Sequence, residues 1–251
     1  AWVRGISGWT VKFLTPAETG HGHRHPEDIE AIYAASRLSA GARQRARAVW
    51  HELVRAEARV HGTSENEVHF HEVGRLSNIL AVGLCAQFLE TLELERIAAS
   101  PIPVSDGEVI CAHGTVPYPA PAMFAMMPGV AVRPSSGIGE LVTPTGLAML
   151  KGFGAHFGPW PEMQISSAVN VFVPGCTFDN VPNGTRFLLG GRSRSPQNNL
   201  LGTEITKAQK AQCLCAFCLA VIRSKERYQP LSRMLTRSRI VSASTGPRCC
   251  Q

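Results

Sequence analysis

One stretch restricts the fold more than any other: "SAGARQRARAVWHELVRAEARV" at residues 39–60. It is rich in Ala, Arg and Glu, and its larger apolar side chains recur at the spacing of one helical stripe. The stripe consists of Ala46, Val49, Trp50, Leu53 and Val60. The segment therefore predicts a long amphipathic helix with one apolar face.

Helix signals alternate with strand signals elsewhere in the chain. Pro26 suits the first turn of a helix, and Thr143 can cap another that continues to about His156. Residues 79–94 are apolar almost all round and predict a buried helix, and a short helix is expected at 121–127. The strand-like segments are "WVRGISGWTVKFL", read as two strands around a Gly-Ile-Ser-Gly turn, "RIAASPIPV", "EVICAHG" and "EMQISSAV". The alternation predicts an α/β fold, of mixed α+β type.

The charge is distributed unevenly. Residues 1–191 hold 14 Lys and Arg against 17 Asp and Glu, a net −3, whereas residues 192–251 hold 11 against 2, a net +9. The polar, Pro-containing "RSRSPQNNL" follows Gly191. We therefore predict a folded core at 1–191 and a basic tail at 192–251 that is either poorly ordered or divergent. That tail matches no nucleic-acid-binding motif, although its charge would predict salt-sensitive binding if it had such a role.

Composition favours a soluble protein of a reducing compartment. The apolar fraction of 44% argues against extensive disorder, and the eight cysteines show no regular disulfide framework. No signal peptide is visible, and the longest apolar stretch, "CLCAFCLAVI" at 213–222, is about half of a membrane helix. That stretch is typical of a packed helix in which cysteines act as small hydrophobes. We expect a cytoplasmic location and no membrane contact.

The segment "VHFHEVG" at residues 68–74 places His69, His71 and Glu72 within four positions. In a strand, His69 and His71 would project from the same face because side chains alternate. In the first turn of a helix, His69 and Glu72 would be neighbours at i and i+3. Either geometry supplies two ligands of a metal site, and a plain polar strand face explains the pattern equally well.

Further imidazoles and one helix start add to this pattern. His21, His23 and His25 alternate in a loop, where imidazoles could share one ion or simply be solvated. His113 stands at a strand-to-loop transition and could be structural or a ligand. In "TPTG", Thr143, Thr145 and Gly146 open a helix, where backbone N–H groups could stabilise a phosphate or form an ordinary cap.

Several segments in fixed order over about residues 3–190 resemble one known family. They are "HRHPEDIEAI", "AEARVHG", "EVHFHEVG", "ASPIPV", "CAHGTVPYPAPA" and "GELVTPTGLAMLK". Together they are similar to the nickel insertion protein of lactate racemase maturation, the LarC family. The resemblance implies a nickel chelatase, a lyase that inserts Ni(II) into pyridinium-3,5-bisthiocarboxylic acid mononucleotide and so forms the nickel pincer nucleotide. It further implies CTP with Mg or Mn, the lactate racemase apoprotein as a partner, and it allows a homo-oligomer.

The resemblance also assigns expected roles to residues. His69, His71 and Glu72 match the family's H-F-H-E signature, and His21, His23 and His25 match its His-rich loop. His113 and the Thr143, Thr145 and Gly146 segment match two further signatures, which implies a metal ligand and a nucleotide-binding helix start.

Two departures from the family pattern stand out. Ser77 and Ala81 occupy the places where the family has aspartates in G-x-x-D-S-I-x-D, and carboxylates are the natural ligands of a hard divalent ion. The glycine-rich beginning of the family is absent. Whether the chain is an enzyme is therefore open, and the alternative is a non-catalytic nickel-binding protein, a truncated or divergent family member.

Overall fold

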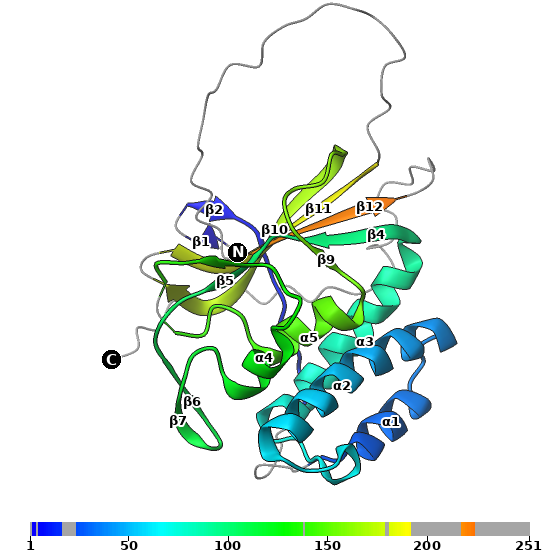
Figure 1. The fold of residues 1–251 in the computed structure, drawn as a ribbon. Helices are drawn as coiled ribbons and strands as arrows, with labels where there is room; N and C mark the ends of the chain where they lie inside the picture. The colour runs from blue at the N-terminus through cyan, green and yellow to red at the C-terminus, as the bar shows by residue number, and fades with distance from the viewer. Residues whose placement is uncertain are drawn as a thin grey trace, which may run out of the picture.

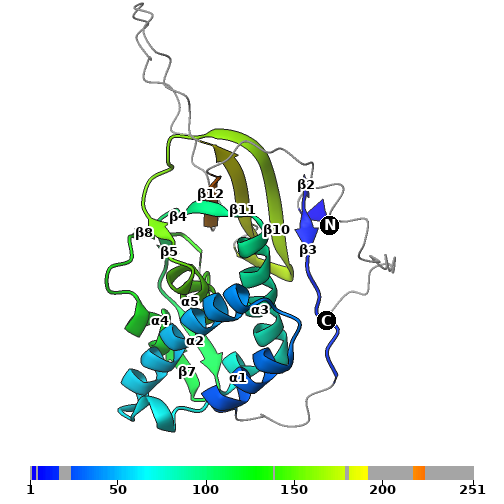
Figure 2. The ribbon, with the colours of Figure 1, turned by 90° about the vertical axis from the view of Figure 1, so that its right-hand side faces the viewer.

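The computed structural model describes residues 2–3, 5–16, 24–137, 139–178, 181–191 and 217–223. Within them, helices gather on one side of a mixed six-stranded sheet, as two views at right angles show (Figures 1 and 2). The helices are α1 Pro26–Ala35, α2 Ala40–His61, α3 Leu76–Thr91, α4 Pro121–Met126 and α5 Pro144–Gly152, with 3-10 turns η1 Glu65–Glu67 and η2 Glu72–Gly74. The predicted α/β class, of mixed α+β type, is confirmed.

The main sheet has the order β3-β10-β11-β12-β4-β9. Its strands are β3 Trp9–Thr10, β4 Leu94–Ala99, β9 His156–Phe157, β10 Gln164–Phe178, β11 Val181–Gly191 and β12 Phe217–Arg223. Three two-stranded sheets lie outside it: β1 Trp2–Val3 with β2 Ile6–Ser7, β5 Ile102–Val104 with β8 Val132–Pro134, and β6 Glu108–Cys111 with β7 Gly114–Pro117. The last of these is an antiparallel hairpin with a two-residue turn, in which Cys111 pairs with Gly114.

Helix α2 is the centre of the core, as its amphipathic pattern predicts. Val49 and Leu53 are fully buried, and Trp50 donates a 2.8 Å hydrogen bond from Nε1 to the Tyr33 hydroxyl. The backbone of α5 comes so close that a Cβ on Gly152 would lie 2.5 Å from the Val49 Cα. The middle of α2 is therefore fixed by close packing, and this fixes the position of its last turn.

Local signals predicted several helix ends correctly. Helix α1 begins at Pro26, and Thr143 caps α5 by accepting a 3.1 Å hydrogen bond from the Gly146 backbone nitrogen. The predicted end of α5 near His156 is wrong: the helix stops at Gly152, Gly154 takes a positive φ of 74°, and His156 pairs with Ala98 in the sheet. The strand pairing of His156 overrides its place in the helical pattern.

Predictions of which residues are buried need three corrections. Val60 on α2 is 36% exposed, although Ala58 two residues earlier is buried. Helix α3 buries Ile79 and Val82, but its opposite face leaves Leu84 43% and Phe88 64% exposed. The uniformly apolar sequence of α3 therefore does not mark a helix buried on all sides.

Two further predictions, one of a turn and one of a helix, also differ from the structure because strands form there. Residues Ile6–Ser7 of the predicted opening turn form β2 instead, and the turn lies at Gly5, whose φ is 78°. The packed helix expected within 213–222 is wrong for its second half, because Phe217–Arg223 forms β12 between β11 and β4. The boundary near residue 191 stays a prediction, but this part of the tail belongs to the central sheet.

Candidate metal centre

The "VHFHEVG" segment is neither a full strand nor the start of an α-helix. Phe70 makes an isolated antiparallel bridge with Arg24, with N–O distances of 2.8 and 3.2 Å, and η2 follows at Glu72–Gly74. The Arg24 guanidinium also donates to the Gly74 carbonyl oxygen. The Asn78 side-chain amide donates 3.1 Å hydrogen bonds to the carbonyl oxygens of Glu72 and Val73. Short contacts of this kind hold the segment without an extended ladder.

The predicted alternation of side chains is nevertheless confirmed. Val68 and Phe70 are buried, with 3% and 1% exposure, and Phe70 packs against the Trp50 ring at a centroid distance of 5.3 Å. His69 between them is exposed, and His71 is half-buried. The rings of His69 and His71 lie 5.0 Å apart, edge to face. The apolar side of the segment is anchored in the core, so the imidazole side is presented outward.

His25 comes next to these rings from the start of α1. Its backbone nitrogen donates to the Asp28 carboxylate at 2.8 Å, and its ring centroid lies 6.2 Å from that of His69. The His25 Nδ1 lies 3.2 Å from the Val68 carbonyl oxygen. A carbonyl can only accept, so the ring donates from Nδ1 in this contact, and Nε2 is the nitrogen left to face a ligand. His21 and His23 lie outside the described residues.

His113 is brought to the cluster by the tip of the β6–β7 hairpin. Its ring centroid lies 5.4 Å from His71 and 5.0 Å from His61, which ends α2. The elements that meet here are far apart in sequence: α1, α2, the Val68–Gly74 segment and the hairpin. The fold therefore brings together every described histidine that the sequence singled out and adds His61.

Glu57 supplies a carboxylate among these rings. It lies one turn before His61 on α2, with its Oε2 3.5 Å from the His61 Nε2. Burial raises the pKa of Glu57, and the neighbouring Glu72 acts in the same direction, while His113 and His69 oppose the rise. Glu57 is thus a partly desolvated carboxylate whose electrostatic neighbours are all members of the cluster.

The arrangement suits a metal ion but is not a finished coordination sphere. Two imidazoles bound to one first-row ion at about 2 Å have ring centroids roughly 5 to 6 Å apart, and the spacings here are 5.0 to 6.2 Å. In the described part of the chain, however, no group of three or more histidine, cysteine, aspartate or glutamate side chains is placed so that it could hold a metal ion as it stands. Two of the four ring pairs meet edge to face and the other two are tilted, and binding would require side-chain rotation.

Glu57 and His61 are the site residues that sequence reasoning missed. Both lie in "AEARVHG", within an Ala- and Arg-rich helix whose outer face looks like an ordinary solvated surface. The available signal was their i, i+4 spacing at the end of that helix, which places both side chains on one face.

The predicted nucleotide-binding start of α5 contains a satisfied cap. The Thr143 hydroxyl oxygen accepts from Gly146, so the Gly146 N–H is already paired. Ser77 and Ala81 lie one turn apart on α3, on the face opposite Ile79 that also exposes Leu84 and Phe88. The face where the family has two carboxylates therefore carries no charge at either position.

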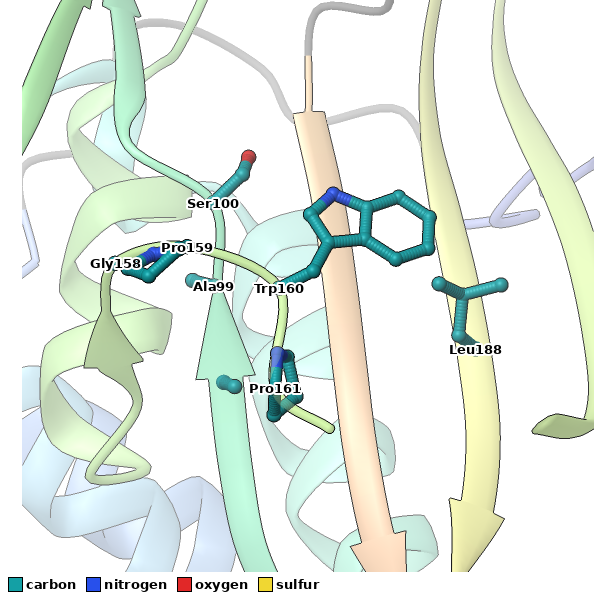
Figure 3. Close-up of a pocket in the computed structure, with 8 residues that line it drawn as sticks. Ala99, Ser100, Gly158, Pro159, Trp160, Pro161 and Leu188 are labelled. Atoms are coloured by element: carbon teal, nitrogen blue, oxygen red, sulfur yellow. The ribbon is translucent and has the colours of Figure 1, made fainter. Parts of the chain in front are cut away.

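A shallow hollow lies on the sheet, away from these groups. It is lined by Ala98, Ala99, Ser100, Gly158, Pro159, Trp160, Pro161 and Leu188 (Figure 3). Ser100 carries the one hydroxyl among these side chains, and no lining residue bears a charge. The hollow lacks ligands for a metal or a phosphate.

Comparison with known proteins identifies the family. A family model described as "Nickel insertion protein" matches residues 2–214. The chain belongs to this family. A putative nickel insertion protein of Geobacter metallireducens is 36% identical over 192 residues, which cover 74% of this chain and 47% of the relative.

Other relatives agree with this assignment. A putative nickel insertion protein of Pelobacter propionicus is 41% identical over 162 residues, covering 64% of this chain and 41% of its own length. In Geobacillus kaustophilus, a pyridinium-3,5-bisthiocarboxylic acid mononucleotide nickel insertion protein is 37% identical over 177 residues, covering 70% and 43%. The chain spans about half the length of these relatives. No solved structure shows significant similarity to it. No helix in the described ranges meets the length and apolarity that crossing a membrane requires.

Proposed function

We propose that this protein binds Ni(II) as its substrate and inserts it into pyridinium-3,5-bisthiocarboxylic acid mononucleotide, with CTP and Mg or Mn, in the cytoplasm. The observation that carries the proposal is the meeting of His69, His71 and Glu72 with His61, His113 and Glu57 at one place. Imidazole nitrogen is a suitable donor for nickel, and a carboxylate adds negative charge. Family membership supports nickel as the ion. The lactate racemase apoprotein is the proposed recipient of the finished cofactor.

Nickel insertion requires a site that binds the ion and then releases it to the substrate. Neutral imidazoles bind nickel without adding charge, so the ion keeps its affinity for the anionic sulfur groups of the substrate. Forming a carbon–nickel bond replaces a ring C–H and releases one proton. Glu57 and Glu72 are the carboxylates in the cluster that could accept it, and the raised pKa of Glu57 brings its proton affinity nearer to neutral pH.

We propose that the nucleotide contacts the start of α5, at Thr143, Thr145 and Gly146. Helix α5 has nine residues, and its first turn carries the positive end of the dipole. The Thr143 hydroxyl accepts from Gly146 and still has its own proton to donate. This segment is the proposed contact for a phosphate of CTP or of the mononucleotide.

A second candidate function is nickel binding without catalysis. One observation favours it: Ser77 and Ala81 stand where the family has aspartates. In this case the imidazole cluster would hold nickel but would not metallate the mononucleotide.

The deciding experiment combines binding and turnover on the purified full chain. Bound nickel is measured by elemental analysis, and the metallated mononucleotide by mass spectrometry, with and without CTP and Mg or Mn. The test variant is His69→Ala with His71→Ala, and the control is His51→Ala, an exposed α2 histidine paired with Glu65. We expect nickel and product in the control, and less nickel and no product in the test variant. Nickel without product supports the second candidate, and no nickel in the unmodified chain contradicts both.

A further inference from the structure

The imidazoles of the cluster form a row. Successive ring centroids are 6.2 Å apart from His25 to His69 and 5.0 Å from His69 to His71. They are then 5.4 Å apart from His71 to His113 and 5.0 Å from His113 to His61. The two ends come from different elements, because His25 precedes α1 and His61 ends α2. The row therefore has two ends: an outer pair, His25 and His69, and an inner pair, His113 and His61.

The carboxylates are not shared equally along the row. Glu57 pairs with His61 at 3.5 Å, and His113, ahead of His69, lowers the pKa of Glu57. Glu72 follows His71 directly in the chain. At the other end, the Nδ1 of His25 contacts the Val68 carbonyl oxygen, which leaves its Nε2 for a ligand. Each end therefore has its own donor set.

The number of donors also exceeds what one ion needs. Nickel in nitrogen and oxygen surroundings takes about four to six donors in planar or tetragonal geometry. Five imidazoles and two carboxylates are gathered here. A single ion would leave at least one end of the row unused.

We propose that this row holds two nickel ions: an outer ion at His25 and His69, and an inner ion at His61, His113 and Glu57, with His71 between them. The proposal rests on the proposed function. Glu57 and Glu72 offset the repulsion between two divalent ions. The inner position is the one beside the carboxylates, so it is the position from which nickel passes to the substrate while the outer position is reloaded.

The test is nickel stoichiometry on the metal-free full chain, with thiols kept reduced. The protein is dialysed to equilibrium against nickel sulfate, and bound nickel is measured by elemental analysis. Two double variants are compared: His25→Ala with His69→Ala for the outer position, and His61→Ala with His113→Ala for the inner one. His156→Ala, on β9 in the main sheet, is the control. Circular dichroism checks that each variant is folded.

We expect about two bound ions in the unmodified chain and the control, and about one in each double variant. One ion in the unmodified chain, lost from both double variants, would show a single centre; this overturns the two-ion proposal and leaves the proposed function standing. If either double variant loses both ions, or keeps both, the two-ion proposal is also overturned. No nickel in the unmodified chain overturns the proposed function together with this inference.

Discussion

Helix α2 carries two regions of opposite character within 22 residues. In its middle, Val49 and Leu53 are fully buried against α5 and the rest of the core. In its last turns, Glu57 and His61 meet imidazoles from two other segments, His113 of the β6–β7 hairpin and His69 of the Val68–Gly74 segment. Packing fixes the helix at one place, and the titratable groups are held at another. Stability and metal binding should therefore be separable along this one helix, with stability set in its middle and metal binding in its last turn.

The largest effect is expected from Leu53→Ala in the middle of α2. Removing a fully buried leucine leaves a cavity and should lower the free energy of unfolding by about 2 to 5 kcal/mol. Bound nickel per folded molecule should not change, because Leu53 contributes no ligand. Urea unfolding and nickel analysis give the two values. The matched control is Leu84→Ala, whose side chain is 43% exposed on α3 and should cost under about 1 kcal/mol. Equal costs in the two variants would contradict the assigned core.

Gly74→Ala should affect both properties, because it lies where the histidine segment meets the core. A Cβ on Gly74 would stand 2.8 Å from the Phe70 Cβ, so the segment must shift. Overpacking of this kind costs about 1 to 3 kcal/mol. Loss of support behind metal ligands typically weakens metal affinity by about 10- to 100-fold. Unfolding and nickel titration measure the two effects, with Gly191→Ala as control, since a Cβ there meets nothing within 4 Å. Unchanged nickel affinity would show that the backbone of this segment does not position the imidazoles.

A division between local and long-range signals explains which parts of the fold could be predicted. Pro26 and Thr143 act within one turn of their own helices, so these helix starts follow from local sequence. Strand β12 does not, because a short apolar run fits a helix or a strand, and its pairing with β11 and β4 depends on residues far away in the chain. The exposed face of α3 escapes prediction for a similar reason: composition does not say which side meets a partner.

The site shows the same division between local and non-local signals. The outward placement of His69 and His71 followed from period-two alternation around Phe70. His25 was marked within the 21–25 histidine run and His113 by itself, but only the tertiary fold places both in one row. Glu57 gave only its i, i+4 spacing to His61 as a signal, because its importance comes from burial and from neighbours on other elements. Ligand types were readable from the sequence, and their assembly was not.

A smaller effect is expected from Thr143→Ala at the start of α5. Loss of the hydrogen bond from the Gly146 backbone nitrogen to the Thr143 hydroxyl should cost about 1 kcal/mol. Nickel binding should stay unchanged, and CTP affinity, measured by calorimetric titration, should fall. Thr143→Ser keeps the hydroxyl and is the control for both values. CTP affinity equal in the two variants would leave Thr143 with a capping role alone and contradict the proposed nucleotide contact.

The smallest change in stability, and one of opposite sign, is expected from Glu57→Gln. Because burial raises the pKa of Glu57 in the folded state above its ordinary 4.5, the folded protein binds the proton more tightly than the unfolded chain does. This residue's favourable contribution is complete below pH 4.5 and is lost as the pH rises through the raised folded pKa. Above that range the native carboxylate is a charged group held partly out of water. Glutamine removes this cost, so the metal-free variant should be more stable than the unmodified protein at neutral pH, and the gain should vanish toward acid pH.

We expect Glu57→Gln to bind nickel more weakly than the unmodified protein, since glutamine removes the negative charge beside His61 and His113. Thermal unfolding from acid to neutral pH, with and without nickel, measures both effects. Glu65→Gln is the control, because that carboxylate faces the exposed His51 outside the row. A stability gain that persists unchanged at acid pH would mean that the charge of Glu57 is not its cause. A gain at neutral pH together with weaker nickel binding would show that the last turn of α2 retains a destabilising carboxylate for the ion it binds.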